Sequence, residues 1–405
     1  MSDPFGGGFD PRMFEQVPLF RELQKVMSWT GGPVNWDLAG QTAMAIATDA
    51  DTRATSDRDV EELAQAVHTA ELWLDQVTDL PGIDGPVRAF TQEQWVREAA
   101  RHEGLGAYVE PVAQQMGAAL SQQLPEELAG MAGAGGPGNP FAQAMQSMGA
   151  MLYGMQTGTI AGHLAGQLLG AYGLGVPTID ARIVGTVGGT ADRFARDYDF
   201  DAVEFRHWLA LSEAAHRRMF AGVSWLSEHV AGLVRRFAAD AEFDPGSLFD
   251  QLGGAGLDPS DPTSMQRALE SPDAFRIEPT SAQRATLGRL QALISFTEAW
   301  VDTVIESAAG DKLTALPRIS EALRRRRAEH GPGEQFLQQL VGLDLSPADV
   351  RQAQAFCAAV IAARGQEGLD RVWRDASHLP DPQELGEPSR WLVRMAAAEL
   401  TDGSE

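Results

Sequence analysis

A regular spacing of glycine is the feature that most restricts how this chain can fold. Between Tyr153 and Gly170 a glycine stands at every fourth position, at residues 154, 158, 162, 166 and 170. Each glycine inside a helix costs about 1 kcal/mol relative to alanine. On a helix this spacing forms a stripe without side chains, against which a second helix can pack closely. Gln156, His163 and Gln167 interrupt the segment, so the pattern predicts a tightly packed central helix and not a membrane span.

Most of the remaining chain has helical periodicity, so we predict a mainly α, multi-helix globular protein. Its 405 residues are 44% hydrophobic and 22% charged, which is typical of such proteins. The main strand-like segment is Val176–Val187. Gly130–Pro140 is too rich in Gly and Pro to hold regular structure and is the best internal boundary. The irregular stretch Asp244–Asp273 is a candidate lid for a cleft.

The charge balance excludes some classes of partner. Asp and Glu number 56 against 32 Lys and Arg, which gives a net charge of -24. This disfavours nucleic acid and anionic membranes as partners. The start of the chain lacks the basic flank and apolar core of a secretory signal. The one cysteine, Cys357, lies among apolar residues and is predicted to be a buried, inert thiol. We therefore predict a cytoplasmic protein.

One predicted helix, Val203–Phe220, carries a candidate site. Its centre reads Ser212-Glu213-Ala214-Ala215-His216, which differs by one residue from the His-Glu-x-x-His motif of metallopeptidases. In that motif two histidines at i and i+4 aim at one metal, and the glutamate deprotonates the metal-bound water. Here the glutamate and the second histidine are present, and Ser212 occupies the first position.

Stretches along nearly the whole chain resemble the zincin-like family of zinc-dependent metalloproteases and hydrolases that is typical of actinobacteria. They are Gly32–Ala39, Ala70–Asp75, the glycine-repeat helix, Trp208–His216, Trp225–Leu226, Phe296–Asp302 and Leu379–Arg394. The resemblance implies an α+β core that is mostly helical around a small sheet. We divide the chain into a flexible lead-in (1–18), an N-terminal helical region (19–129), a linker (130–140), a zincin-like core (141–310) and a C-terminal helical region packed on the core (311–405).

The resemblance also implies roles for individual residues. His216 would be the second zinc-binding histidine, Glu213 the general base, and Glu298 the third ligand, presented from a second helix. Glu298 stands in Glu-Ala-Trp, where the family usually has Glu-Gly-Trp. Ser212 takes the place of the missing ligand, and its hydroxyl is too short to reach where an imidazole nitrogen would lie. Loss of one of four zinc ligands removes roughly 3 kcal/mol, or about a hundredfold in affinity.

Other side chains are candidates to replace the missing zinc ligand or to pair with the two glutamates. His207 lies nine residues before His216, about 180° around the helix, and so faces away. His163 and His229 lie on other predicted helices and remain open as substitutes. Arg324–Arg327 circle their helix, which favours a solvated terminus over a docking patch for an acidic partner. Glu213 and Glu298 could also be held by a hydrogen bond or a salt bridge, with Arg217 or Arg218 as candidate partners, and His216 would then be a core histidine with its hydrogen bonds satisfied.

The first hypothesis is a zincin-like protein with weak or no peptidase activity, which acts by binding or scaffolding a peptide or protein. The alternative is an active zinc-dependent metallohydrolase, a peptidase with a substitute first ligand, so the sequence leaves open whether the protein is an enzyme. In a third hypothesis Ser212 is a nucleophile and His216 its base. It is disfavoured because Ser212 lies inside a helix, without the exposed Gly-x-Ser-x-Gly turn and the oxyanion donors of acyl transfer.

Overall fold

The computed structural model describes Trp29 and residues 31–47, 54–122, 140–241, 279–328 and 346–402. Most of these residues are helical, and the strands among them form one short two-stranded sheet. This confirms the predicted mainly α class. The predicted lead-in (1–18), the linker (130–140, apart from Pro140) and the candidate lid Asp244–Asp273 lie outside the described residues. Among the helices that are described, none is long and apolar enough to cross a membrane.

The glycine stripe packs closely against a second helix, as predicted. It lies on α7 (Pro140–Ala165), which runs alongside α2 (Trp36–Ala47). A Cβ atom added at Gly154 would lie 2.5 Å from the carbonyl oxygen of Asn35, and one at Gly162 would lie 2.7 Å from the Cβ atom of Ile46. The stripe is shorter than predicted, because α7 ends at Ala165. Gly170 lies in the loop beyond and serves the site described below.

We expect Gly158→Ala to destabilise the protein by about 1–3 kcal/mol, because the new methyl group would overlap α2. At Gly158 an added Cβ atom would lie 2.8 Å from Thr42 Cβ and closer still to the carbonyl oxygen of Ala39. Gly149 is the matched control on the same helix, since a Cβ atom there meets nothing within 4 Å. Gly149→Ala should stabilise by roughly 0.5–1 kcal/mol through helix propensity. Thermal unfolding of both variants tests the pair, and shifts of the same sign would contradict it.

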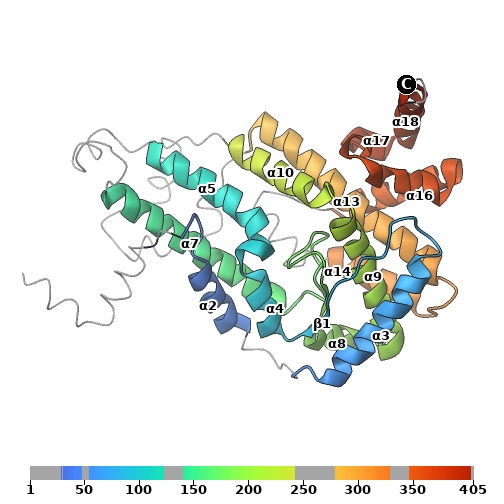
Figure 1. The fold of residues 1–405 in the computed structure, drawn as a ribbon, viewed down its shortest axis with the longest axis horizontal. Helices are drawn as coiled ribbons and strands as arrows, with labels where there is room; N and C mark the ends of the chain where they lie inside the picture. The colour runs from blue at the N-terminus through green and yellow to red at the C-terminus, as the bar shows by residue number, and fades with distance from the viewer. Residues whose placement is uncertain are drawn as a thin grey trace, which may run out of the picture.

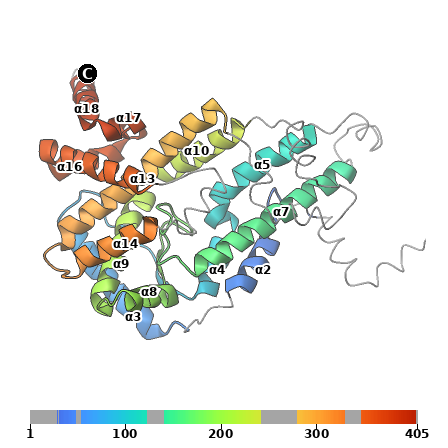
Figure 2. The same ribbon diagram turned by 180° about the vertical axis from the view of Figure 1, so that it is seen from behind.

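Helix α9 (Ala202–Gly222) is largely buried and contacts both α3 (Asp57–Leu74) and α13 (Ser281–Ala309) (Figure 1). Helix α10 (Leu226–Ala239) runs beside α13 and also contacts α5 (Ala107–Gln122), which in turn packs on α7. Seen from behind, α14 (Leu316–Ala328) and α8 (Gly188–Asp197) lie nearest the viewer (Figure 2). The long α13 therefore contacts both α9 and α10 along its length.

The C-terminal helices gather at one end of the molecule, where α16 packs on α13 (Figure 1). They are α16 (Pro347–Asp370), η3 (Arg371–Arg374), η4 (Ala376–His378), α17 (Pro382–Gly386) and α18 (Pro388–Asp402). Elsewhere in the chain, two helical segments precede α5, namely α4 (Gln92–Ala99) and η2 (His102–Gly106). Cys357 on α16 is fully buried, and burial raises the pKa of its thiol to about 12. This confirms the predicted buried thiol.

Capping boxes start several of these helices, including α13 and α16, which border the site described below. At the start of α13 the Thr280 hydroxyl accepts from the Gln283 N–H, and the Gln283 side chain accepts from the Thr280 N–H. Ser346 and Asp349 make the same reciprocal pair at the start of α16. Each arrangement satisfies two N–H groups that would otherwise lack a partner at a helix start. Local sequence thus fixes where α13 and α16 begin.

A two-stranded parallel sheet completes the core. Strand β1 (Val87–Phe90) pairs with β2 (Val184–Val187), with Val87 opposite Val184 and Phe90 opposite Val187. The predicted strand Val176–Val187 was therefore too long. Its first part is a loop, because Gly175 adopts a left-handed backbone conformation with φ of 71° and Pro177 lacks an N–H to donate to a sheet. Strand β1 was missed because four residues are too few for an alternating pattern to show.

Candidate functional site

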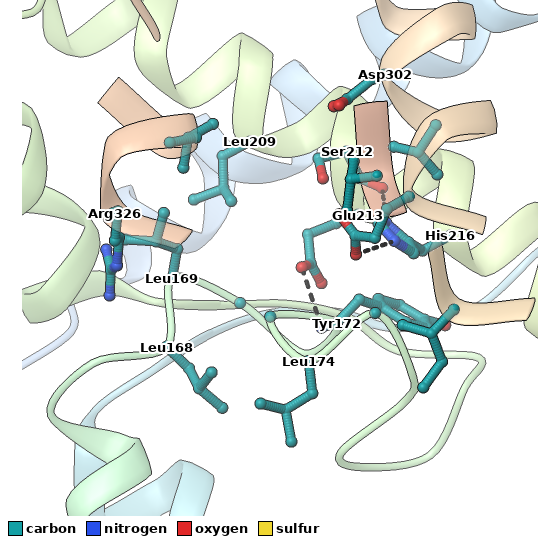
Figure 3. A pocket seen from close by; sticks show the side chains of 18 of the residues that line it. Leu168, Leu169, Tyr172, Leu174, Leu209, Ser212, Glu213, His216, Asp302 and Arg326 are labelled. Carbon is teal, nitrogen blue, oxygen red and sulfur yellow. Dashed lines mark hydrogen bonds and ion pairs between the residues drawn. The ribbon is translucent and has the colours of Figure 1, made fainter. Parts of the chain in front are cut away.

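A cleft with a volume of about 170 Å³ lies between α9, α13 and the loop that joins α7 to β2. Helix α14 and the start of α16 border it as well. Most of its wall is apolar, and the apolar residues are Leu168, Leu169, Leu174, Trp208, Leu209, Ile294, Val301, Leu323 and Val350. Its polar side chains include Ser212, Glu213, His216, Glu298, Asp302 and Arg326. Figure 3 shows how several of these side chains converge on the cleft.

Helix α9 contributes three of the predicted site residues. It begins after Asp201, whose Oδ1 atom accepts hydrogen bonds of 2.9 Å from the N–H groups of both Val203 and Glu204. Glu213 and His216 are 2% exposed, and Ser212 between the apolar turns is half-buried. A helix that is covered on nearly all sides holds its side chains in fixed positions. The spacing of the motif therefore places all three residues on the cleft wall.

The carboxylate of Glu213 is held by the backbone of the neighbouring loop and strand. Its two oxygens accept hydrogen bonds from the N–H groups of Ala171 (3.1 Å), Tyr172 (3.3 Å) and Gly185 (3.4 Å). Burial raises the pKa of Glu213 to about 7, against the lowering effect of His216 and of these N–H groups. Of the two alternatives for this carboxylate, the hydrogen bonds form, whereas Arg217 and Arg218 pair with Glu71 and not with Glu213. Glu213 instead fastens the loop to strand β2.

Gly170 makes this arrangement possible. A Cβ atom at residue 170 would lie 2.6 Å from the Cδ atom of Glu213 and 2.8 Å from the carbonyl oxygen of Gly185. Real Cβ atoms do not approach other atoms so closely, so a larger residue would push the Glu213 carboxylate away from its donors. The last glycine of the sequence stripe therefore shapes the site, where it lies against the Glu213 side chain of α9 and strand β2 and not against α2.

His216 faces Glu298 across the cleft. Its Nε2 atom lies 3.5 Å from Oε1 of Glu298, while its Nδ1 atom is 2.8 Å from the carbonyl oxygen of Ser212. A carbonyl accepts only from a donor, so Nδ1 carries a proton. The Tyr172 ring stacks on the imidazole, with ring centroids 5.0 Å apart. Together these contacts fix the orientation of His216.

Two protonation states of His216 satisfy this geometry. Burial opposes the charged imidazolium, but the adjacent Glu298 carboxylate outweighs it, so the pKa of His216 lies above its ordinary value. In the charged state the two side chains form a buried ion pair. In the neutral state Nε2 has a lone pair, no hydrogen-bond partner among the described residues, and an orientation suited to a metal. His216 and Glu298 thus satisfy each other without a metal in the charged state, and in the neutral state they could supply two ligands to a metal ion.

Ser212 lines the cleft, but its hydroxyl makes no hydrogen bond with His216, whose Nδ1 atom faces the Ser212 backbone carbonyl instead. This leaves the nucleophile hypothesis without its required contact. His207 faces away, as predicted, and its ring stacks on Trp73. His163 and His229 do not line the cleft, so neither replaces the missing first ligand.

The residues present do not complete a zinc site. A catalytic zinc takes three protein ligands and leaves one position for water or substrate. Within the described residues, no three His, Cys, Asp or Glu side chains come together in a way that could hold a metal. His216 and Glu298 could provide two ligands, and Ser212 stands where the motif has its first histidine. Asp302, one helical turn after Glu298, also lines the cleft, but Gln354 Nε2 donates a hydrogen bond of 2.9 Å to its Oδ2 atom.

Sequence reasoning missed two charged residues of the cleft. Asp302 could have been found, since positions i and i+4 share a helix face and Glu298 was already singled out. Arg326 was assigned with its neighbours to a solvated helix terminus. The structure corrects this assignment for Arg326, whose guanidinium lies 5.0 Å from the centre of the Phe194 ring and donates to the carbonyl oxygen of Gln167.

Comparisons with known proteins identify a family and a similar fold. A family profile described as zincin-like metallopeptidase matches residues 34–392. The fold is similar to a crystal structure described as a candidate hydrolase with a novel fold from Chloroflexus aurantiacus. That similarity has a TM-score of 0.63 at 21% sequence identity and covers 90% of this chain and 99% of the other. No curated protein matches the chain in sequence.

Proposed function

Because this chain belongs to the zincin-like metallopeptidase family, we propose that it binds a peptide in the cleft between α9 and α13 and cleaves peptides weakly or not at all. The observation that carries this proposal is Ser212. It occupies the position at which the motif needs its first histidine, and among the described residues His216 is the one histidine that lines the cleft. We retain a cytoplasmic location as part of the proposal.

The surroundings of Glu213 give its carboxylate a structural role in the cleft wall. Both oxygens of Glu213 accept hydrogen bonds from backbone N–H groups of the loop and of strand β2. In this arrangement the carboxylate stabilises the wall of the cleft. Removal of its charge should therefore affect the shape of the wall, and not a chemical step alone.

The size and lining of the cleft suit a peptide side chain. Its volume of about 170 Å³ is close to that of an apolar cavity of about 150 Å³ that takes a benzene molecule. Ligand sites are mostly apolar, with a few polar groups that orient the ligand. The leucines of this cleft supply the apolar surface, and its charged side chains supply the polar contacts.

The alternative function is that of an active zinc-dependent metallohydrolase with a substitute first ligand. One observation favours it: the neutral form of His216 presents Nε2 toward Glu298, so two ligands lie side by side. Asp302, four residues after Glu298, lines the same cleft, and its carboxylate could serve as a further ligand. It would first have to exchange its hydrogen bond with Gln354.

A library of N-acetylated hexapeptides, incubated with the protein in EDTA, tests the proposal. Mass spectrometry of the peptides that stay bound to the protein, and of those that are cleaved, then separates binding from hydrolysis. We expect saturable peptide binding without cleavage. Val350→Trp should weaken the peptide affinity by roughly tenfold or more, because Val350 lines the cleft. Val393→Trp is the control, since Val393 is 70% exposed on α18 and does not line the cleft.

The same library in micromolar zinc tests the alternative. Cleavage that requires zinc, stops on addition of EDTA and is lost in Glu213→Gln would overturn the proposal and establish a metallohydrolase. Retention that Val350→Trp leaves unchanged would place peptide binding elsewhere on the protein.

A further inference from the structure

Arg326 differs from the arginines beside it on α14. Arg324 and Arg325 have side chains that are 56% and 68% exposed, and both pair with Glu321, at 3.3 Å and 2.9 Å. Arg326 is half-buried and lines the cleft. Its position is fixed by stacking on the Phe194 ring and by its hydrogen bond to the carbonyl oxygen of Gln167.

Among the described residues, no Asp or Glu side chain forms an ion pair with Arg326. A second cation, Arg193, lies nearby and is itself turned to the carbonyl oxygen of Gly166, at 2.7 Å. Burial first, and then Arg193, lower the pKa of Arg326, whereas Tyr198 has the opposite effect. A guanidinium remains charged in proteins. A charge that is partly removed from water and not paired gains most from an anion that enters the cleft.

The cleft is therefore polarised. Figure 3 shows Arg326 on one side and Glu213 and His216 on the other, with Leu209 between them in this view. Glu298 and Asp302 add further carboxylates to the lining. A complementary ligand carries an anion at one end, an apolar group in the middle, and hydrogen-bond donors at the other end.

We infer that Arg326 binds the C-terminal carboxylate of a peptide, whose last, apolar side chain lies among the leucines and whose backbone N–H groups face the acidic side. A guanidinium donates two parallel hydrogen bonds to a carboxylate, which gives both affinity and orientation. This inference rests on the proposed peptide-binding function, and it adds that the cleft selects peptide C-termini over internal segments.

The test compares N-acetyl-Ala-Ala-Leu, which has a free carboxylate, with its C-terminal amide by isothermal titration calorimetry in EDTA. The parent should bind the carboxylate form about tenfold to a hundredfold more tightly. Arg326→Gln should abolish this preference and leave the affinity for the amide unchanged. Arg325→Gln, one position away and exposed, should keep it, and Arg326→Lys should keep part of it because it retains the charge.

Each contrary result has its own meaning. Equal affinity of the parent for the two peptides, or a preference that persists in Arg326→Gln, would overturn the role of Arg326 and leave the proposed function standing. A parent that binds neither this pair nor the hexapeptide library would overturn the proposed function together with the inference. A third peptide, N-acetyl-Ala-Asp-Leu amide, distinguishes a terminal from a side-chain carboxylate, and its binding as tightly as the free acid would contradict selection for the C-terminus.

Discussion

Ser212→His is expected to bind zinc about a hundredfold more tightly than the parent protein, since one added ligand contributes roughly 3 kcal/mol. His216 already has its Nδ1 atom directed to a backbone carbonyl, which leaves Nε2 for a metal, and Glu298 lies 3.5 Å from it. A histidine at position 212 would complete the i, i+4 pair on α9. Ser212 is half-buried and lines the cleft, so the larger ring has space. Zinc content after dialysis and competition with a chelating dye measure the change.

Two variants control this experiment. Ser212→Gln adds similar bulk without an imidazole and should leave zinc affinity at the level of the parent. Ser212→His combined with Glu298→Gln should lose most of the gain, because an amide is a weaker zinc ligand than a carboxylate. Stoichiometric zinc in the parent would sink the interpretation of Ser212 as a lost ligand. Failure of Ser212→His to gain affinity would mean that position 212 does not aim at the metal position defined by His216 and Glu298.

The second large effect is on stability. Arg218→Met should destabilise the protein by about 3 kcal/mol, since it removes the buried arginine of an ion-pair network whose carboxylates are partly exposed. Arg218 is 1% exposed and ties α9 to α3 and the chain beyond it. Its guanidinium donates to the Glu71 carboxylate (2.8 Å), to Asp75 (2.6 Å) and to the carbonyl oxygen of Leu80 (2.8 Å). Methionine fills much of the space but leaves the Leu80 carbonyl without this donor and Glu71 with Arg217 as its remaining guanidinium partner.

Arg235→Met is the matched control, because Arg235 and its partner Glu228 are 52% and 74% exposed. Exposed ion pairs contribute about 0–1 kcal/mol, so this variant should unfold almost like the parent. Urea unfolding followed by circular dichroism compares the midpoints. Equal shifts for the two arginines would mean that burial of the Arg218 network does not matter for stability.

Local sequence determined much of the fold. Helical periodicity predicted the mainly α class, and the four-residue glycine spacing predicted the close contact that Gly154 and Gly162 make with α2. Both patterns are short-range properties of one segment, since the helix period alone decides which side chains share a face. The same reasoning placed His207 away from the site. The pairing of Glu298 with His216 came from the family resemblance, because no local pattern links residues on two separate helices.

The tertiary structure decided what each of these faces meets. Glu213 is held by N–H groups from a loop and a strand far from it in sequence, and no spacing within α9 encodes those partners. Four consecutive arginines point in all directions around a helix, so the run itself could not show that Arg326 turns to the cleft. Local sequence thus determined which residues lie on one helix face, whereas long-range packing determined their partners. The reason is that side-chain periodicity is local, whereas the contacts that form a site join residues far apart in sequence.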